Sequence, residues 1–95
     1  MNITEIHIHP VTPSRGLVAF AHLILDDSLL LGSIAIYEKL GGGYRITYPQ
    51  KSDHYVFHPI TQPFSRLLED AIINEMKNVM GKSHDGHHRP EYPAR

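Results

Sequence analysis

The chain has 95 residues and no cysteine, and its nine basic and ten acidic side chains give a formal net charge of −1. This length fits a single domain with one thin core, and the missing cysteines exclude a disulfide framework, a thiolate zinc finger and a cysteine nucleophile. No apolar run is long enough to span a bilayer and the N-terminus lacks the pattern of an export signal, so we expect a cytoplasmic protein without a membrane partner.

The first two strands are predicted from alternation and from apolar content. Ile3–His9 alternates between β-branched and polar residues, and Pro10 and Pro13 are expected to end this strand. Leu17–Leu25 is apolar on both faces, which is typical of a strand covered on both sides. Asp26-Asp27-Ser28 then predicts a tight hairpin into the next strand.

Three further segments extend this series of strands. Residues 29–37 predict a third strand, and Gly41-Gly42-Gly43 predicts a loop whose backbone needs positive φ or unusual freedom. Residues 44–48 alternate in the manner of a fourth strand that Pro49 ends, and residues 55–58 suggest a short fifth strand.

From residue 61 onward the apolar period becomes helical. Thr61 or Gln62 is expected as the N-cap and Gly81 as the C-cap. Glu75 falls in the middle of the apolar stripe, whereas Met76 falls outside it. The stripe consists of Phe64, Leu67, Leu68, Ala71, Ile72 and Val79.

Strands followed by one helix predict an α+β fold, with a four- to five-stranded antiparallel meander and one C-terminal amphipathic helix. One helix covers only one face of the sheet, yet residues 17–25 are apolar on both faces. We therefore expect a second copy to cover the other face and form a strand-mediated homodimer. The domain spans residues 1–81, and residues 82–95 form a polar, histidine-rich tail.

Three stretches carry a family resemblance: Ile3-Thr4-Glu5-Ile6 through the Leu25-Asp26 turn, His58-Pro59-Ile60, and Asp70-Ala71-Ile72-Ile73-Asn74-Glu75. Their order and spacing resemble the SpoVG family of bacterial septation and sporulation regulators. The resemblance implies a small dimeric DNA-binding and RNA-binding protein that regulates transcription or a later step of gene expression.

The resemblance also implies where nucleic acid is bound. In the family, a Pro-Ser followed by basic residues after the fourth strand contacts the phosphate backbone, and Pro49-Gln50-Lys51-Ser52-Asp53 stands there in this chain. Phosphate contacts need cations and base stacking needs aromatic rings, so weak and salt-sensitive binding is expected from a few residues. The predicted contact set is Lys51, Arg45, Lys39, Arg15, Tyr44 and Tyr48.

The histidines suggest a metal site as an alternative. Glu5, His7 and His9 share one side of the first strand, and two histidines at i and i+2 beside a carboxylate can bind a divalent metal if a neighbouring strand or subunit adds a ligand. The other interpretation is a solvent-facing polar strand. His84, His87 and His88 in the tail have the density of a weak metal-binding tract.

Patterns of catalytic chemistry are missing from the sequence. It has no nucleophile elbow and no Ser/His/Asp arrangement, and the triple glycine lacks the lysine of a phosphate-binding loop. We therefore expect no enzymatic activity and no cofactor. The leading hypothesis is a dimeric nucleic-acid-binding regulator, and the alternatives are a protein-interaction module of the same fold without nucleic-acid binding, or a histidine-based metal-binding domain.

Overall fold

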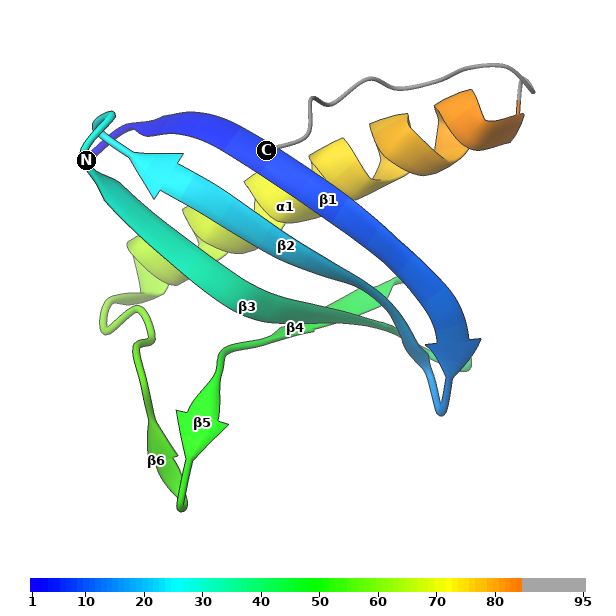
Figure 1. The fold of residues 1–95 in the computed structure, drawn as a ribbon, viewed down its shortest axis with the longest axis horizontal. Coiled ribbons are helices and arrows are strands. Elements are labelled where there is room, and N and C mark those ends of the chain that lie inside the picture. Colours follow the sequence, from blue (N-terminus) through cyan, green and yellow to red (C-terminus); the bar gives the residue numbers. More distant parts are fainter. Residues whose placement is uncertain (85–95) are drawn as a thin grey trace.

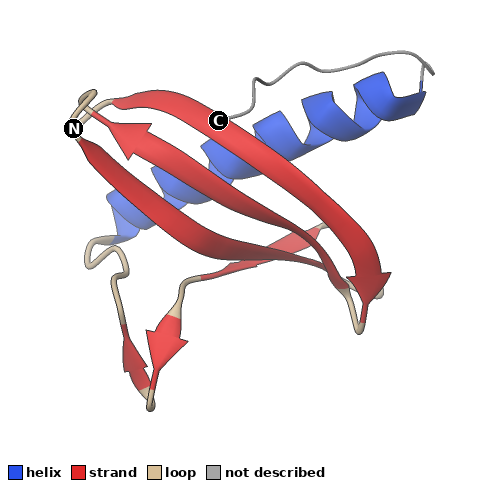
Figure 2. Cartoon of the chain, in the orientation of Figure 1, coloured by secondary structure: helices blue, strands red, loops and turns tan. Residues whose placement is uncertain are grey.

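A computed structural model describes residues 1–84 of the chain, with side chains described for residues 1–80. A four-stranded sheet in the order β1-β2-β3-β4 forms one layer, and a single helix, α1, forms the other (Figures 1 and 2). All neighbouring strands of this sheet are antiparallel. The predicted α+β meander with one C-terminal helix is confirmed, while most of the predicted tail lies outside the described residues.

The first strand, β1 (Ile3–Ser14), is longer than predicted because it continues through both prolines. It lies at an edge of the sheet, where a proline without an N–H group does not interrupt pairing with an inner strand. The pairing with β2 is irregular between Pro10 and Ser14, so the chain passes Pro13 through a bulge. The prediction that Pro10 and Pro13 end the strand was wrong for this reason.

A tight turn connects the central strands β2 (Leu17–Leu25) and β3 (Leu29–Glu38). Asp26 and Asp27 have φ values of 51° and 54°, and the Ser28 N–H donates to the Leu25 carbonyl, which confirms the predicted hairpin. Short β4 (Tyr44–Thr47) then pairs with the end of β3.

The triple glycine connects β3 to β4. Gly42 and Gly43 have φ values of 102° and 84°, which are unfavourable for residues with a side chain. The prediction that this loop needs positive φ is therefore confirmed.

Residues 50–55 form a separate hairpin, which we call the arm. It consists of β5 (Gln50–Lys51) and β6 (His54–Tyr55), which pair only with each other, around a turn with positive φ at Ser52 and Asp53. Figure 1 shows the arm projecting beyond the four-stranded sheet. The predicted fifth strand therefore does not join the main sheet.

The helix α1 (Gln62–His84) starts where the sequence predicts, with the Thr61 carbonyl accepting a hydrogen bond from the Ser65 N–H. It continues through Gly81, because one glycine lowers helix stability by only about 1 kcal/mol and need not end a helix. The apolar face is also rotated relative to the prediction. Met76 is fully buried, whereas Leu67 is 48% exposed.

The buried row of α1 advances by four residues, through Leu68, Ile72 and Met76. Helices pack through ridges formed by side chains four residues apart, which fit into the grooves of the opposing surface. The i, i+4 ridge therefore contacts the sheet, instead of the stripe that the apolar period predicts. Glu75 lies beside the row and is partly exposed, so it does not occupy the centre of the buried face as predicted. The sheet side of the core consists of Ile8, Val18, Ala19, Ala21, Leu23, Leu25, Ile34 and Ile36.

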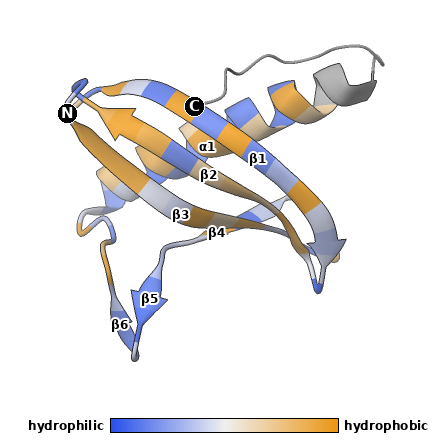
Figure 3. Cartoon of the chain, viewed as in Figure 1, coloured by the Kyte–Doolittle hydropathy of each residue, from blue (hydrophilic) through white to orange (hydrophobic). Residues whose placement is uncertain are grey.

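The face of the sheet opposite α1, which we call the open face, is turned toward the viewer in Figures 1 and 3. The strand register places alternate residues of the four strands on it, and no described element covers them. Phe20 and Leu30 on this face are 36% and 62% exposed. The open face is formed by Glu5, His7, His9, Phe20, His22, Ile24, Leu30, Ala35, Tyr37, Arg45 and Thr47.

Candidate functional site

The arm carries exposed members of the candidate site. Lys51 is exposed and is paired in the ladder with His54. Tyr55 is 51% exposed, and its ring centroid lies 4.8 Å from that of His58. The Val56 N–H donates to the Pro49 carbonyl at 2.8 Å, which closes the base of the arm. The arm therefore presents one cation, one imidazole and one aromatic ring to solvent, and the His58 ring lies beside that of Tyr55.

Tyr55 was not among the predicted contact residues. The signal that identifies it is the pair Ser52-Asp53, since polar residues that accept positive φ make a two-residue hairpin turn. A hairpin centred on this turn leaves its flanking side chains without a sheet to pack on.

Two of the predicted cations meet at one end of the sheet. Arg15 lies in the β1–β2 turn and Lys39 follows β3, and both are exposed. A hydrogen bond joins the β1–β2 turn to the end of β3, because the Glu38 N–H donates to the Gly16 carbonyl at 2.8 Å. The structure thus brings Arg15 and Lys39 to the same end of the sheet.

Arg45 is exposed on the open face of β4. Its guanidinium carbon lies 4.7 Å from the centre of the Tyr37 ring, a cation–π geometry. The contact ties the guanidinium to the ring of its cross-strand partner, Tyr37. Arg45 is therefore held in place at the margin of the open face, on β4.

The two predicted stacking residues, Tyr44 and Tyr48, lie on the other side of the sheet. Both are partly buried and pack against the core, and the Tyr48 ring contacts Phe57 edge to face with centroids 6.0 Å apart. Tyr44 shares the side of Ile46, which pairs with the core residue Ile36. Their packing makes both rings part of the core layer, so the aromatic ring that the arm exposes is that of Tyr55.

Burial raises the pKa of the Tyr48 phenol from 10.0 to about 12, and the negative charge of Glu69 adds to this effect. The Tyr48 hydroxyl is buried and has no hydrogen-bond partner among the described residues. Both facts follow from placing a phenol, rather than a phenyl ring, against the core.

Tyr48→Phe is expected to increase the free energy of unfolding at neutral pH, because leaving a buried polar group without a partner costs about 1–3 kcal/mol. Because the pKa of Tyr48 is raised in the folded state, ionisation of this phenol lowers the free energy of unfolding of the wild type as pH rises from 10 toward 12. Tyr48→Phe has no phenol at this position, so its free energy of unfolding is expected to fall less over the same range. Urea titrations at pH 7 and pH 11 measure both effects. Tyr55→Phe is the control, and equal stability of wild type and Tyr48→Phe at pH 7 would contradict the prediction.

The histidines predicted as metal ligands form two contacts instead of one cluster with Glu5. The His7 Nε2 atom lies 2.8 Å from the Glu5 Oε1 atom, whereas the His9 Nε2 atom lies 3.0 Å from His22 Nδ1 on the neighbouring strand. The direct cross-strand partners are His7 with His22 and His9 with Phe20, so the contact between His9 and His22 runs diagonally across the ladder, within reach of long side chains. No group of three or more possible metal ligands occurs among the described residues.

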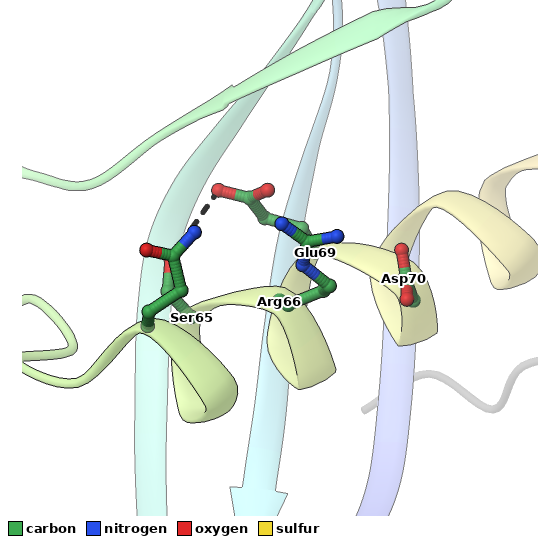
Figure 4. A pocket seen from close by; sticks show the side chains of 5 residues that line it. Ser65, Arg66, Glu69 and Asp70 are labelled. Carbon is green, nitrogen blue, oxygen red and sulfur yellow. Dashed lines mark hydrogen bonds between the residues drawn. The ribbon is translucent and has the colours of Figure 1, made fainter.

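A polar pocket of about 290 Å³ lies along the first turns of α1 (Figure 4). In it the Ser65 Oγ atom donates to Glu69 Oε2 at 3.4 Å, and Arg66 and Asp70 add opposite charges. None of the residues predicted to contact nucleic acid or metal lines this pocket. It is therefore separate from the candidate site on the arm.

No helix in the described part of the chain combines the length and apolar character that crossing a bilayer requires.

Comparison with known proteins identifies the family. The SpoVG family model matches residues 1–78. A putative septation protein SpoVG of Treponema denticola is 30% identical over 77 residues, covering 77% of this chain and 83% of the relative. Those of Borrelia hermsii and Finegoldia magna are 34% and 28% identical, over 79% and 86% of this chain and 85% and 80% of the relatives. The chain belongs to the SpoVG family.

Proposed function

We propose that this protein is a homodimeric, cytoplasmic regulator that binds DNA or RNA through its arm. The observation that carries the proposal is the projection of the arm, which exposes Lys51 and Tyr55 within one short hairpin. Lysine neutralises phosphate and an exposed ring stacks on bases, which are the two parts of sequence-tolerant nucleic-acid binding. The names of the relatives support a role connected with septation, and the family resemblance supports one connected with sporulation.

The open face supports the dimer. Phe20, Ile24 and Leu30 give it an apolar centre, and α1 covers only the opposite face. Contiguous apolar surface of this kind marks protein contacts in soluble proteins. We propose that a second copy covers the open face, so that the two arms act on one nucleic acid.

The number of cations sets the expected salt dependence. Each neutralised phosphate contributes about −0.9 to the slope of log K against log salt concentration on duplex DNA. A dimer using only its two Lys51 residues would have a slope of about −2, and one using Arg15, Lys39 and Arg45 as well would have a slope of about −7. Binding is therefore expected to be weak at physiological salt and steeply dependent on ionic strength.

Lys51→Glu is expected to abolish binding, because it replaces attraction by repulsion at the phosphate in both arms. Fluorescence anisotropy with mixed duplex and single-stranded oligonucleotides would measure the affinity at 50 mM and 200 mM salt. Affinity that depends on several phosphate contacts differs greatly between these two salt concentrations. Lys77→Glu on α1 is the matched control, since it makes the same change of net charge on an exposed residue outside the arm. Equal loss in both variants would show that only net charge matters and would contradict an arm-specific contact.

The open apolar face also favours a second candidate function, that of a protein-interaction module that keeps the dimer without binding nucleic acid. The same titration separates the two. Absence of binding by wild type at both salt concentrations would favour the interaction module, whereas binding that weakens steeply with salt would favour the regulator.

A further inference from the structure

Three imidazole rings lie side by side on the open face, where the edge strand β1 pairs with β2. The His22 ring contacts both of the others: it is tilted against His7, with ring centroids 4.7 Å apart, and stacked on His9, with ring centroids 4.9 Å apart. The His9 Nε2 atom lies 3.0 Å from the His22 Nδ1 atom. The cluster thus points two nitrogen atoms from adjacent strands at each other.

We propose that His9 and His22 form half of a transition-metal site, which the same two residues of a second copy complete as a four-imidazole zinc site. Zinc binds four ligands tetrahedrally with Zn–N distances of about 2.0–2.1 Å, which separates ligand nitrogens by about 3.3 Å. The observed separation of 3.0 Å is close to this value. Small rotations of the two rings would make room for the ion in place of the hydrogen bond between them.

The site is incomplete within one chain. Among the described residues there is no group of three possible ligands, and the His7 imidazole already contacts the Glu5 carboxylate at 2.8 Å. A twofold axis beside His9 and His22 doubles the two nitrogens to the four that zinc requires. The inference rests on the proposed dimer through the open face, in which Phe20 and Leu30 supply the surrounding apolar contact.

His7 and Glu5 have a positioning role in this arrangement. The His7 ring packs on His22 and Glu5 holds His7, so the orientation of the His22 imidazole is fixed before metal arrives. The Glu5 carboxylate also places a negative charge near a divalent cation. Residues around the ligands commonly orient them in this way.

The test is a zinc titration of the full chain. Because the tail histidines could also bind zinc, all measurements are made in a background variant that combines His84→Asn, His87→Asn and His88→Asn. Calorimetry after treatment with EDTA gives the stoichiometry, and cobalt(II) absorption reports tetrahedral coordination. We expect one zinc ion for every two chains and an intense visible cobalt spectrum.

Two further variants locate the site. Loss of a residue that only hydrogen-bonds to a zinc ligand weakens zinc binding by roughly tenfold to hundredfold. His9→Asn and His22→Asn remove the ligands themselves, so each is expected to weaken zinc binding by more than this. His54→Asn on the arm is the matched control and is expected to bind zinc as the background does. One zinc per chain, no zinc binding, or binding unchanged in His9→Asn and His22→Asn would overturn the proposal.

Sedimentation velocity with EDTA and with zinc distinguishes the metal site from the dimer on which it rests. A dimer in EDTA that takes up no zinc overturns the metal site and leaves the proposed dimer intact. A monomer in EDTA that zinc converts to a dimer supports the metal site and shows that the metal-free dimer was wrong. The nucleic-acid contact of the arm is measured separately, through Lys51→Glu.

Discussion

Met76→Ala is expected to lower the free energy of unfolding by about 2–5 kcal/mol, the usual cost of truncating a buried methionine or leucine to alanine. Met76 is fully buried at the end of the row of α1 that packs on the sheet. Removing its side chain leaves a cavity between two rigid layers, which cannot collapse completely. Urea titrations followed by circular dichroism would measure the change.

Leu67→Ala is the matched control on the same helix. Leu67 is 48% exposed, so its truncation is expected to change the free energy of unfolding by only about 0.5 kcal/mol, as for most surface substitutions. All variants are compared at one chain concentration, because the proposed dimerisation would couple stability to concentration. A larger effect for Leu67→Ala than for Met76→Ala would mean that α1 packs with the face that the sequence stripe predicts.

Tyr55→Ala is expected to weaken binding of single-stranded oligonucleotides by about 1–3 kcal/mol, the contribution of one base stacked on an aromatic side chain. This corresponds to a loss of affinity of about five- to 150-fold. The physical reason is that the ring of Tyr55, half exposed on the arm, is available to a base, whereas those of Tyr44 and Tyr48 pack on the core.

Tyr55→Phe keeps the ring and is expected to bind as wild type does, since stacking does not require the hydroxyl. Anisotropy titrations at low salt give both affinities. If Tyr55→Ala and Tyr55→Phe both bound like wild type, the arm would contact nucleic acid through charge alone. If both were equally weakened, the hydroxyl rather than the ring would make the contact.

Local patterns were sufficient for most of the elements. Apolar residues on both faces of Leu17–Leu25 predicted a central strand, and the two aspartates after it predicted the hairpin that the structure has. The start of α1 followed from Thr61 and the change of apolar period. These features depend on residues close together in sequence, where propensity and hydrogen bonding act directly.

Two of the wrong predictions depended on a neighbour far along the chain. A proline ends a strand whose N–H groups must all donate to neighbouring strands. Pro10 and Pro13 are tolerated in β1 because this strand lies at the sheet edge and has a neighbour on one side only. Which of Leu67 and Met76 is buried depends on the ridge of α1 that meets the sheet, and an average helical period cannot distinguish them.

The sequence by itself determined the family, the α+β class and the supply of histidines and cations, because these follow from residue types and their order. Tertiary structure alone decided which residues share a surface. It turned Tyr48 into the core and Tyr55 outward, and it joined His9 to His22 rather than to Glu5. The physical reason is that strand register, bulges and turn geometry set which side chains meet, and a shift of one residue exchanges the two faces of a strand.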